Sequence, residues 1–400
     1  MIPKIEKIFP RPILDSRGEW TIEVIMQAGE LNVIASVPQG ESAGSREAVT
    51  LPADVAVKNI IEIIAPAVIG FPLGEQDNFD DKLKELDGTV NKEKLGGNTL
   101  LALSIVYARL TARATGLPLW QYLRDLITTP SVKDAQHSVL PAVPPRLFAL
   151  MIEGGLHAGG GSPFQEYLVS PRVATISESV EIVTKLYREL RKLISQRFGP
   201  SATHLGDEGA FAPPVTDPLI PLALIMEAAN LAGLTDKFDI GLDVAASNVS
   251  LKSGELVAVY DEIRASYPLL YLEDPFGEND LDNFGGLLNK YGNEVMIVGD
   301  DLTTTNVEQM KLVEVKHGVN ALIVKPNQIG TVSETLAAVR LAREYNWKII
   351  VSHRGRETND DFIADLAWGI GAYGIKLGAP ARGERVAKYN RLLEIEKASA

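Results

Sequence analysis

The sequence contains no cysteine among its 400 residues. Disulfide bridges, thiolate-bound metals, iron–sulfur clusters and thiol nucleophiles are therefore excluded. Positive charge is also scarce, with 39 Lys and Arg against 52 Asp and Glu and a formal net charge of −13. This balance argues against a nucleic-acid partner, although acidic side chains can still attract divalent cations.

Long apolar runs are missing as well. None reaches the roughly 18 residues that a membrane span requires, and we expect no membrane partner. The N-terminal stretch MIPKIEKIF is too short and too charged for a signal peptide, so we expect a cytoplasmic protein. With 46% hydrophobic and 23% charged residues, the chain can build a large core.

The second half of the chain has a repeating pattern from residue 238 onward. Short apolar runs alternate with stretches typical of helices, such as 332–345, and each run ends in a polar residue. These polar residues lie 24 to 30 residues apart, one β–α unit each: Asp243, Glu273, Asp300, Lys325, Ser352 and Lys376. Such alternation predicts a parallel sheet covered on both faces. Six similar units favour a closed (β/α)8-type barrel, in which chemistry lies where the strands end.

The first part of the chain has a different, α+β character. Residues 12–37 contain two alternating runs with a turn near 29–31, which predicts a hairpin. Residues 98–125 predict a long helix followed by a shorter one. We therefore divide the chain into an N-terminal α+β domain, 1–132, and a C-terminal barrel domain, 133–400, that carries the catalytic and metal site.

Three acidic residues follow successive strands of the predicted barrel. Asp243, Glu273 and Asp300 would converge at its rim, and three carboxylates suit a hard cation such as Mg²⁺. Any one of them alone is more often a helix cap or a loop anchor. Their occurrence in three consecutive units favours the metal site.

Two lysines, Lys325 and Lys376, follow later strands. Repulsion between their ammonium groups and a nearby metal ion, with partial burial, would lower the pKa of a lysine and allow it to act as a base. The alternative is an ordinary ion pair with the neighbouring acids.

Three further motifs contain candidate functional residues. GDEGAFAP places Glu208 between glycines as a candidate general acid, or as part of an exposed turn. GGLHAGGGSP contains His157 in a glycine-rich loop, where a lone histidine is more often a surface residue. SHRGRET offers Arg354 as a fork for a phosphate or carboxylate, with Arg356 as a second positive charge.

Together these residue types suit the removal of a proton beside a carboxylate. That proton is hard to remove because the neighbouring group already carries negative charge. Metal ions would stabilise the dianionic intermediate, a lysine would take the proton, and a carboxylic acid on the opposite side would expel hydroxide.

The chain resembles the enolase family over nearly its whole length. The matching stretches include ILDSRG, GGNTLLALS, FQEYLVSP, GDEGAFAP, IGLDVAAS, LEDPF, VGDDLTTTN, KPNQIGT and GAPARGERVAKYNRLLEIE. The resemblance implies an enolase-type barrel, capped by the smaller N-terminal domain and assembled as a homodimer or larger homo-oligomer. It also implies two Mg²⁺ ions per active site, the second arriving with the phosphorylated hydroxy-acid substrate.

The resemblance assigns a role to each matching residue. Lys325 would be the base, Glu208 and Glu166 would form the acid side, and Lys376 and His157 would bind substrate charge. The first Mg²⁺ would be held by Asp243, Glu273 and Asp300, and the second with the help of Ser42. The remaining substrate-binding residues would be Gln165, Ser352, His353, Arg354, Gly355, Gly40 and Glu41.

Departures from the family pattern cluster on the loops and at the phosphate end. Gln39, Glu41 and Ala43 replace Ser, Ala and Thr of the usual V-P-S-G-A-S-T-G, and the usual S-H-R-S-G-E-T has Gly355 and Arg356 here. Other departures are RLFALMIEGG before the glycine loop, and Gly160, Ala210 and Pro326. The acid–base and metal positions are all retained.

Three functions are compatible with this pattern. The first is Mg²⁺-dependent, reversible dehydration of 2-phosphoglycerate to phosphoenolpyruvate, a hydro-lyase reaction of glycolysis. The second is a paralogue that applies the same chemistry to a phosphoglycerate-like or phosphonate-pathway substrate. The third is a non-catalytic binding or scaffold protein, which would have no need to keep the base, the acid and the metal ligands.

Overall fold

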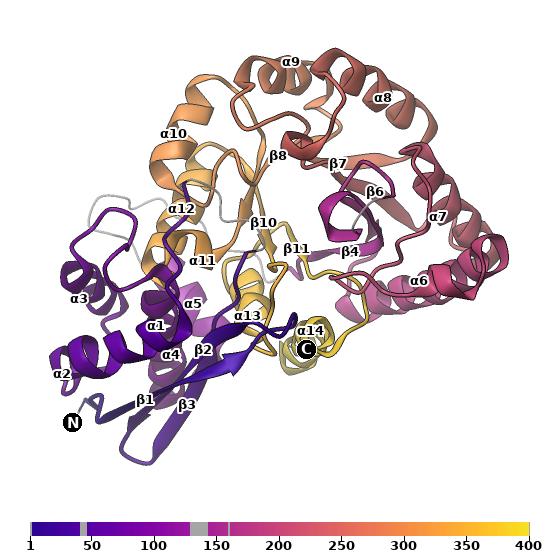
Figure 1. Cartoon of the computed structure of the whole chain (residues 1–400). Coiled ribbons are helices and arrows are strands. Elements are labelled where there is room, and N and C mark those ends of the chain that lie inside the picture. The colour runs from indigo at the N-terminus through magenta and orange to yellow at the C-terminus, as the bar shows by residue number, and fades with distance from the viewer. Residues whose placement is uncertain (1, 41–45, 129–142, 159–160, 400) are drawn as a thin grey trace.

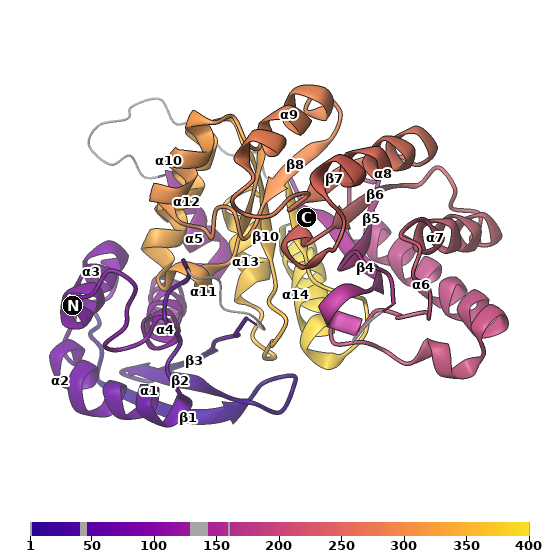
Figure 2. The same ribbon diagram turned by 45° about the horizontal axis from the view of Figure 1, so that its top comes forward.

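The computed structural model describes residues 2–40, 46–128, 143–158 and 161–399 (Figure 1). Along the chain, a small α+β part precedes an eight-stranded barrel, and Figure 2 shows the small part against one side of the barrel. The predicted domain boundary at residues 132 and 133 lies outside the described residues. No single described helix is long and apolar enough to span a membrane, although Gly97–Thr115 and Leu119–Thr128 pass that test as a pair bent by 101°.

The small part consists of one antiparallel sheet followed by helices. The strands, in the order β1-β2-β3, are β1 (Lys7–Leu14), β2 (Trp20–Ala28) and β3 (Leu31–Ser36). The helical segments are α1 (Ala53–Asn59), the π-helical turn η1 (Ile60–Ile64), α2 (Ala65–Val68), α3 (Gln76–Asp87), α4 (Gly97–Thr115) and α5 (Leu119–Thr128). The long and short helices predicted within residues 98–125 are therefore confirmed as α4 and α5.

The hairpin predicted within residues 12–37 is present as β2 and β3. Gly29, with φ +58°, turns the chain between them. The structure differs at the start of the hairpin, because β2 begins at Trp20 and a further strand, β1, precedes it. Pro10 and Pro12 obscure β1 in the sequence, but an edge strand accommodates them because only one of its sides is hydrogen-bonded.

The barrel is closed by eight strands. They are β4 (Arg146–Glu153), β5 (Glu166–Pro171), β6 (Phe238–Asp243), β7 (Leu269–Glu273), β8 (Met296–Gly299), β9 (Ala321–Val324), β10 (Lys348–Ser352) and β11 (Gly374–Lys376). The segments around and between them are η2 (Gly155–Ala158), α6 (Ile176–Phe198), η3 (Pro200–Thr203), α7 (Leu219–Ala232), η4 (Ala246–Asn248), α8 (Ser253–Ser266), α9 (Leu281–Tyr291), α10 (Val307–Val315), α11 (Pro326–Ile329), α12 (Val332–Glu344), α13 (Phe362–Gly369) and α14 (Gly383–Ser399). The predicted barrel and the helix predicted over 332–345 are confirmed.

One strand runs against the others. β5 pairs antiparallel with both β4 and β6, while β6 to β11 follow one another in parallel, as their sequences predicted. The reversal brings the first residue of β5, Glu166, to the rim where the neighbouring strands end. There Glu166 lies opposite Asp243 in one strand pair and Glu153 in the other. A carboxylate that begins its strand therefore joins carboxylates that end theirs.

The barrel interior is filled by side chains rather than open. Aromatic and aliphatic residues from successive strands form its core, including Phe148, Leu150, Leu168, Tyr271, Met296, Val298, Ile323 and Ile350. This packing closes the lower part of the barrel, so the polar residues at the carboxyl ends of the strands form a floor for the site above them.

Buried polar contacts hold the small part against the barrel. Asp80 of α3 accepts a hydrogen bond from the Ser333 amide at the start of α12, at 2.9 Å. Arg109 of α4 pairs with Asp360, at 2.7 Å, and with Asp361, at 2.8 Å, in the loop before α13. Because these charges are largely buried, a shift of the small part would leave them without partners.

Candidate active site

The predicted rim residues surround one polar cavity of about 80 Å³. Glu273 and Asp243 end β7 and β6, Lys376 ends β11, and Lys325 directly follows β9. The predicted residues that line the cavity are Gln165, Glu166, Glu208, Asp243, Asp300, Lys325, Ser352, His353, Arg354, Gly355 and Lys376. Glu273 is completely buried and lies outside this lining.

Lys376 lies among three carboxylates. Its Nζ is 2.7 Å from Oε2 of Glu273, 2.9 Å from Oδ2 of Asp243 and 3.1 Å from Oε2 of Glu166. Burial lowers the pKa of Lys376, but the surrounding negative charges outweigh burial and raise the pKa well above its usual value. Burial, and then repulsion from Asp243, raises the pKa of Glu273 to about 8, and the ammonium groups of Lys376 and Lys325 offset this only in part.

Lys325 is held beside Asp300, with which its ammonium forms an ion pair. Its own amide donates to Thr305 Oγ1 at 3.0 Å, which fixes the backbone where β9 ends. Burial lowers the pKa of Lys325, yet the charge of Asp300 outweighs it and the net pKa is raised. The expected lowering of the lysine pKa assumed a metal ion beside the amine, so it stays a prediction for the site with Mg²⁺ bound.

Asp300 is positioned by a residue that the sequence analysis overlooked. Asp274 accepts hydrogen bonds from the amides of Asp300, at 3.1 Å, and Asp301, at 2.9 Å. It does so from the left-handed region, with φ +39°, which L-residues adopt only when the surroundings demand it. Gln328 donates to the other side of Asp300, at 3.0 Å. The signal in the sequence was the second acid of LEDPF.

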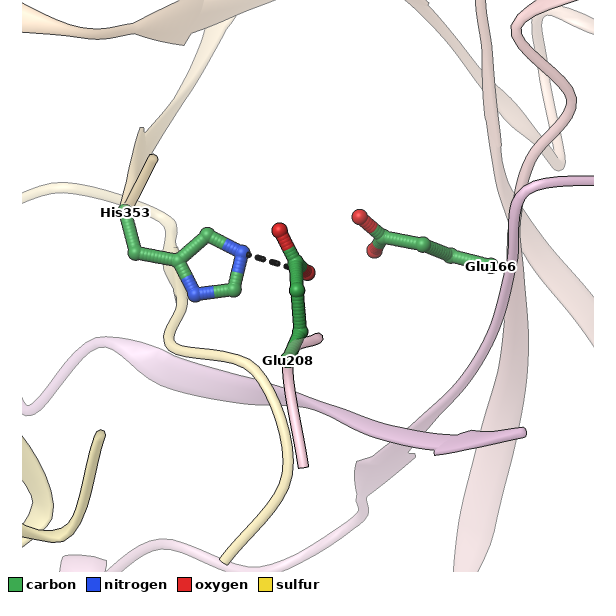
Figure 3. Close-up of side chains that lie close together, drawn as sticks. All are labelled: Glu166, Glu208 and His353. Atoms are coloured by element: carbon green, nitrogen blue, oxygen red, sulfur yellow. Dashed lines mark ion pairs between the residues drawn. The ribbon is translucent and has the colours of Figure 1, made fainter. Parts of the chain in front are cut away.

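The acid side of the cavity contains Glu208, Glu166 and His353. Figure 3 shows the carboxyl group of Glu208 between the ring of His353 and the carboxyl group of Glu166. His353 Nε2 lies 3.1 Å from Oε2 of Glu208. Burial lowers the pKa of His353, and burial raises that of Glu166 well above its usual value. Both shifts favour neutral side chains, which suits a site that donates a proton.

A third buried acid, Glu153, lies beside Glu208 and Glu166. It ends β4, and its Oε2 accepts a hydrogen bond from the Glu208 amide at 3.2 Å. Its side chain lies so close to Gly206 that an added Cβ there would be 2.0 Å from Oε1. Burial, and then the charge of Glu208, raises the pKa of Glu153 to about 8. Glu153 was not among the predicted site residues, although the run RLFALMIE ends in a polar residue as the other strands do.

The phosphate end differs from the expectation of a ready arginine fork. Nη1 and Nη2 of Arg354 already pair with the two carboxylate oxygens of Glu47, at 3.0 and 3.1 Å. Nη1 also donates to Asn327 at 3.0 Å. Glu47 comes from the small part of the chain and gave no signal in the sequence, because its partner lies 307 positions away.

Two of the departing residues meet in space. The backbones of Gln39 and Arg356 pair, with the amide of Gln39 donating to the Arg356 carbonyl at 2.9 Å and the reverse bond at 3.2 Å. Gly40 follows this contact directly. Glu41, Ser42, Ala43 and Gly160 lie outside the described residues, as does the side chain of His157, whose backbone belongs to η2.

The residues at the rim fit a divalent cation. Asp243, Glu273 and Asp300 offer only oxygen atoms, the ligands that Mg²⁺ prefers. Oε1 of Glu273 is buried without a hydrogen bond among the described residues. Two groups of described side chains bring three ligand atoms within 4.8 Å of one another, Asp274 with Asp300 and Asp301, and Glu166 with Glu208 and His353. The predicted triad is not one of these groups, and the ammonium of Lys376 bridges two of its carboxylates.

The closed barrel carries carboxylates and lysines at its rim, with the buried acids Glu166 and Glu208 among them. These features are typical of a barrel enzyme that works by acid–base catalysis. Residues 5–123 match the family described as "Enolase, N-terminal domain", and residues 138–253 and 247–400 match "Enolase, C-terminal TIM barrel domain". "Enolase B" of Dictyostelium discoideum is 40% identical over 428 residues, covering 98% of this chain and 94% of the relative. "Enolase" of Saccharolobus solfataricus is 41% identical over 413 residues, covering 98% of this chain and 95% of the relative. The chain belongs to the enolase family.

Proposed function

We propose that this chain catalyses the reversible dehydration of 2-phosphoglycerate to phosphoenolpyruvate, with magnesium as cofactor. The observation that supports this most strongly is the order of the strands around the barrel. β9 and β5 occupy opposite positions in the closed ring. Lys325, which follows β9, and Glu166, which begins β5, therefore face each other across the cavity. An elimination with a base and an acid on opposite faces of the substrate needs this arrangement.

The strands that lie between β5 and β9 in the ring carry the residues for metal binding and for charge stabilisation. On one side, β6, β7 and β8 supply Asp243, Glu273 and Asp300, which would hold Mg²⁺. When bound, the ion supplies electrostatic stabilisation for the negative charge that the substrate carboxylate gains. On the other side, β11 supplies Lys376 for the same developing charge.

Lys325 would act as the base. It must be neutral to take the proton, so its ion pair with Asp300 has to weaken first. Burial, and then the charges of Arg354 and Lys376, lower the pKa of Lys325, and a cation held by Asp300 would add to this repulsion. The same contact that holds Lys325 in place therefore also controls its basicity.

Glu208, with Glu166 beside it, would protonate the leaving hydroxide. Both carboxyl groups are almost completely buried, and burial raises the pKa of Glu166 well above its usual value. His353 lies beside the carboxyl group of Glu208, and Glu153 accepts a hydrogen bond from the Glu208 amide, so Glu208 is held from two directions. Gln165, Ser352, Gly355 and Gly40 would bind substrate, and Arg354 would bind the phosphate after exchanging part of its pairing with Glu47.

We also propose the roles that the resemblance to enolases implies for residues of the loops. Ser42 and Glu41 would contribute to the second Mg²⁺ and to substrate binding, and His157 would bind substrate charge. We also propose a cytoplasmic homodimer or larger homo-oligomer, and a domain boundary between residues 132 and 133.

The second candidate is a paralogue that applies the same chemistry to a substrate with a different distal group. The paired backbones of Gln39 and Arg356 favour it, because two departures from the family pattern meet beside the loop that contains Arg354. The acid–base residues would serve either substrate.

The absorbance of phosphoenolpyruvate distinguishes the two candidates. Purified protein with Mg²⁺ and 2-phosphoglycerate should turn over at roughly 1–10³ s⁻¹, the usual range for enzymes. A rate equal to the blank, with Mg²⁺ still bound in calorimetry, would exclude 2-phosphoglycerate as the substrate and leave the paralogue.

A further inference from the structure

A tyrosine in the middle of the barrel touches one of the proposed metal ligands. Tyr271 lies on β7, two residues before Glu273, and its side chain is completely buried. Its ring packs against Phe148, with 4.9 Å between the ring centroids. Its hydroxyl forms a short hydrogen bond with Oε2 of Glu273. This polar group therefore sits in the apolar barrel core with the carboxylate above it as its hydrogen-bond partner.

The hydroxyl of Tyr271 donates this hydrogen bond, and the carboxylate oxygen of Glu273 accepts it. Oε2 also accepts from Nζ of Lys376 at 2.7 Å. Both donors engage the same oxygen, while Oε1 has no hydrogen bond among the described residues. The two oxygens of Glu273 are thus unequal before any cation binds.

We propose that Tyr271 is a positioning residue for the metal site, holding Oε2 of Glu273 so that Oε1 is the oxygen presented to Mg²⁺. The inference rests on the proposed role of Glu273 as a ligand. Two donors on Oε2 restrict the rotation of the Glu273 carboxylate, which would leave Oε1 for the cation. Residues that orient metal ligands in this way typically change metal affinity by about 10–100-fold when they are removed.

The test is the affinity for Mg²⁺ alone, measured by titration calorimetry without substrate. Tyr271→Phe keeps the ring and removes the hydroxyl, and we expect the Kd for Mg²⁺ to rise about tenfold. Tyr271→Leu removes the hydroxyl with a different shape and should weaken binding at least as much. The matched control is Tyr107→Phe, since Tyr107 is also buried but donates to the Pro72 carbonyl of the small part, at 2.7 Å. Its Kd should equal that of the unaltered protein.

Two further measurements separate positioning from a structural effect and from failure of the proposed metal site. The infrared carboxylate bands that appear with Mg²⁺ should show wide, monodentate splitting in the unaltered protein and narrower splitting in Tyr271→Phe. Glu273→Gln should lose Mg²⁺ binding almost completely. If Glu273→Gln keeps the original Kd, Glu273 is not a ligand and the inference falls together with the metal assignment. If Glu273→Gln loses binding while Tyr271→Phe stays within twofold of the unaltered Kd, the positioning role alone is overturned.

Discussion

The two ends of the cavity are built in different ways. The acid–base and metal end is built from the ends of barrel strands, among them Lys325, Glu166 and Asp243. The phosphate end joins Arg354 of the barrel to Glu47 of the small part. The first end depends on the closure of one sheet, whereas the second depends on contact between two parts of the chain.

This difference explains where the chain departs from its family. A strand end is fixed by its neighbours in the barrel, and a displaced carboxylate there would lose ion pairs as close as 2.7 Å. The pairing of Gln39 with Arg356 involves two backbones, so it tolerates a change of side chain. We infer that the chemistry is constrained by the barrel, while the fit to the substrate is set by the contact with the small part.

Removing the base should have the largest effect on the acid–base end. Lys325→Ala is expected to lower kcat about 10²–10⁴-fold, the usual contribution of a general base. The absorbance of phosphoenolpyruvate over time measures the loss of kcat, and circular dichroism checks that the barrel is folded. Lys290→Ala, at an exposed site on α9, is the control and should keep full activity. Activity of Lys325→Ala within tenfold of the unaltered protein would contradict the assignment of the base.

Removing the ion pair between Arg354 and Glu47 should mainly reduce the stability of the protein. Glu47→Gln leaves the buried guanidinium of Arg354 without its counter-charge, which should lower the free energy of unfolding by about 3 kcal/mol. Urea denaturation measures this loss. Inorganic phosphate should restore more stability to Glu47→Gln than to the unaltered protein, because the anion replaces the lost carboxylate. An equal effect of phosphate on both proteins would show that Arg354 is not a phosphate ligand.

The buried carboxyl group of Glu153 should make the free energy of unfolding depend on pH. The folded pKa of Glu153, about 8, lies above its ordinary value of 4.5, so protonation favours the folded state. Its stabilising contribution is complete below about pH 4.5 and is lost as the pH rises through 8. The free energy of unfolding should therefore fall with pH between these values by up to about 1.4 kcal/mol per pH unit from this group.

Glu153→Gln should flatten that slope, because the amide accepts the same hydrogen bond without titrating. Exposed Glu30→Gln is the matched control and should leave the slope unchanged. If Glu153→Gln and the unaltered protein show the same dependence on pH, Glu153 does not carry the proton.

The smallest effect should come from restoring the family residues at the phosphate end. The double variant Gly355→Ser, Arg356→Gly returns a hydroxyl that can bind phosphate, worth about 1 kcal/mol for one hydrogen bond. The KM for 2-phosphoglycerate should then fall about fivefold, while kcat stays nearly unchanged. An unchanged KM would show that these departures do not alter specificity.

Sequence patterns predicted the barrel because each strand is a continuous apolar run that ends in a polar residue. They could not predict the reversal of β5, since antiparallel and parallel buried strands have the same composition. The acids of the rim were predicted from their spacing, but the pairing of Arg354 with Glu47 depends on a contact between distant segments. The pairing of Lys325 with Asp300, which raises the pKa of Lys325, could not be predicted either, because only the folded arrangement determines which charge lies nearest.

The most direct test of a separate base and acid at this site is exchange of the substrate proton. Nuclear magnetic resonance follows the replacement of hydrogen at C2 of 2-phosphoglycerate by deuterium in heavy water with Mg²⁺. We predict that Glu208→Gln still exchanges this hydrogen while forming almost no phosphoenolpyruvate, and that Lys325→Ala does neither. Exchange that persists in Lys325→Ala, or that disappears in a folded Glu208→Gln, would contradict the assignment of the two roles.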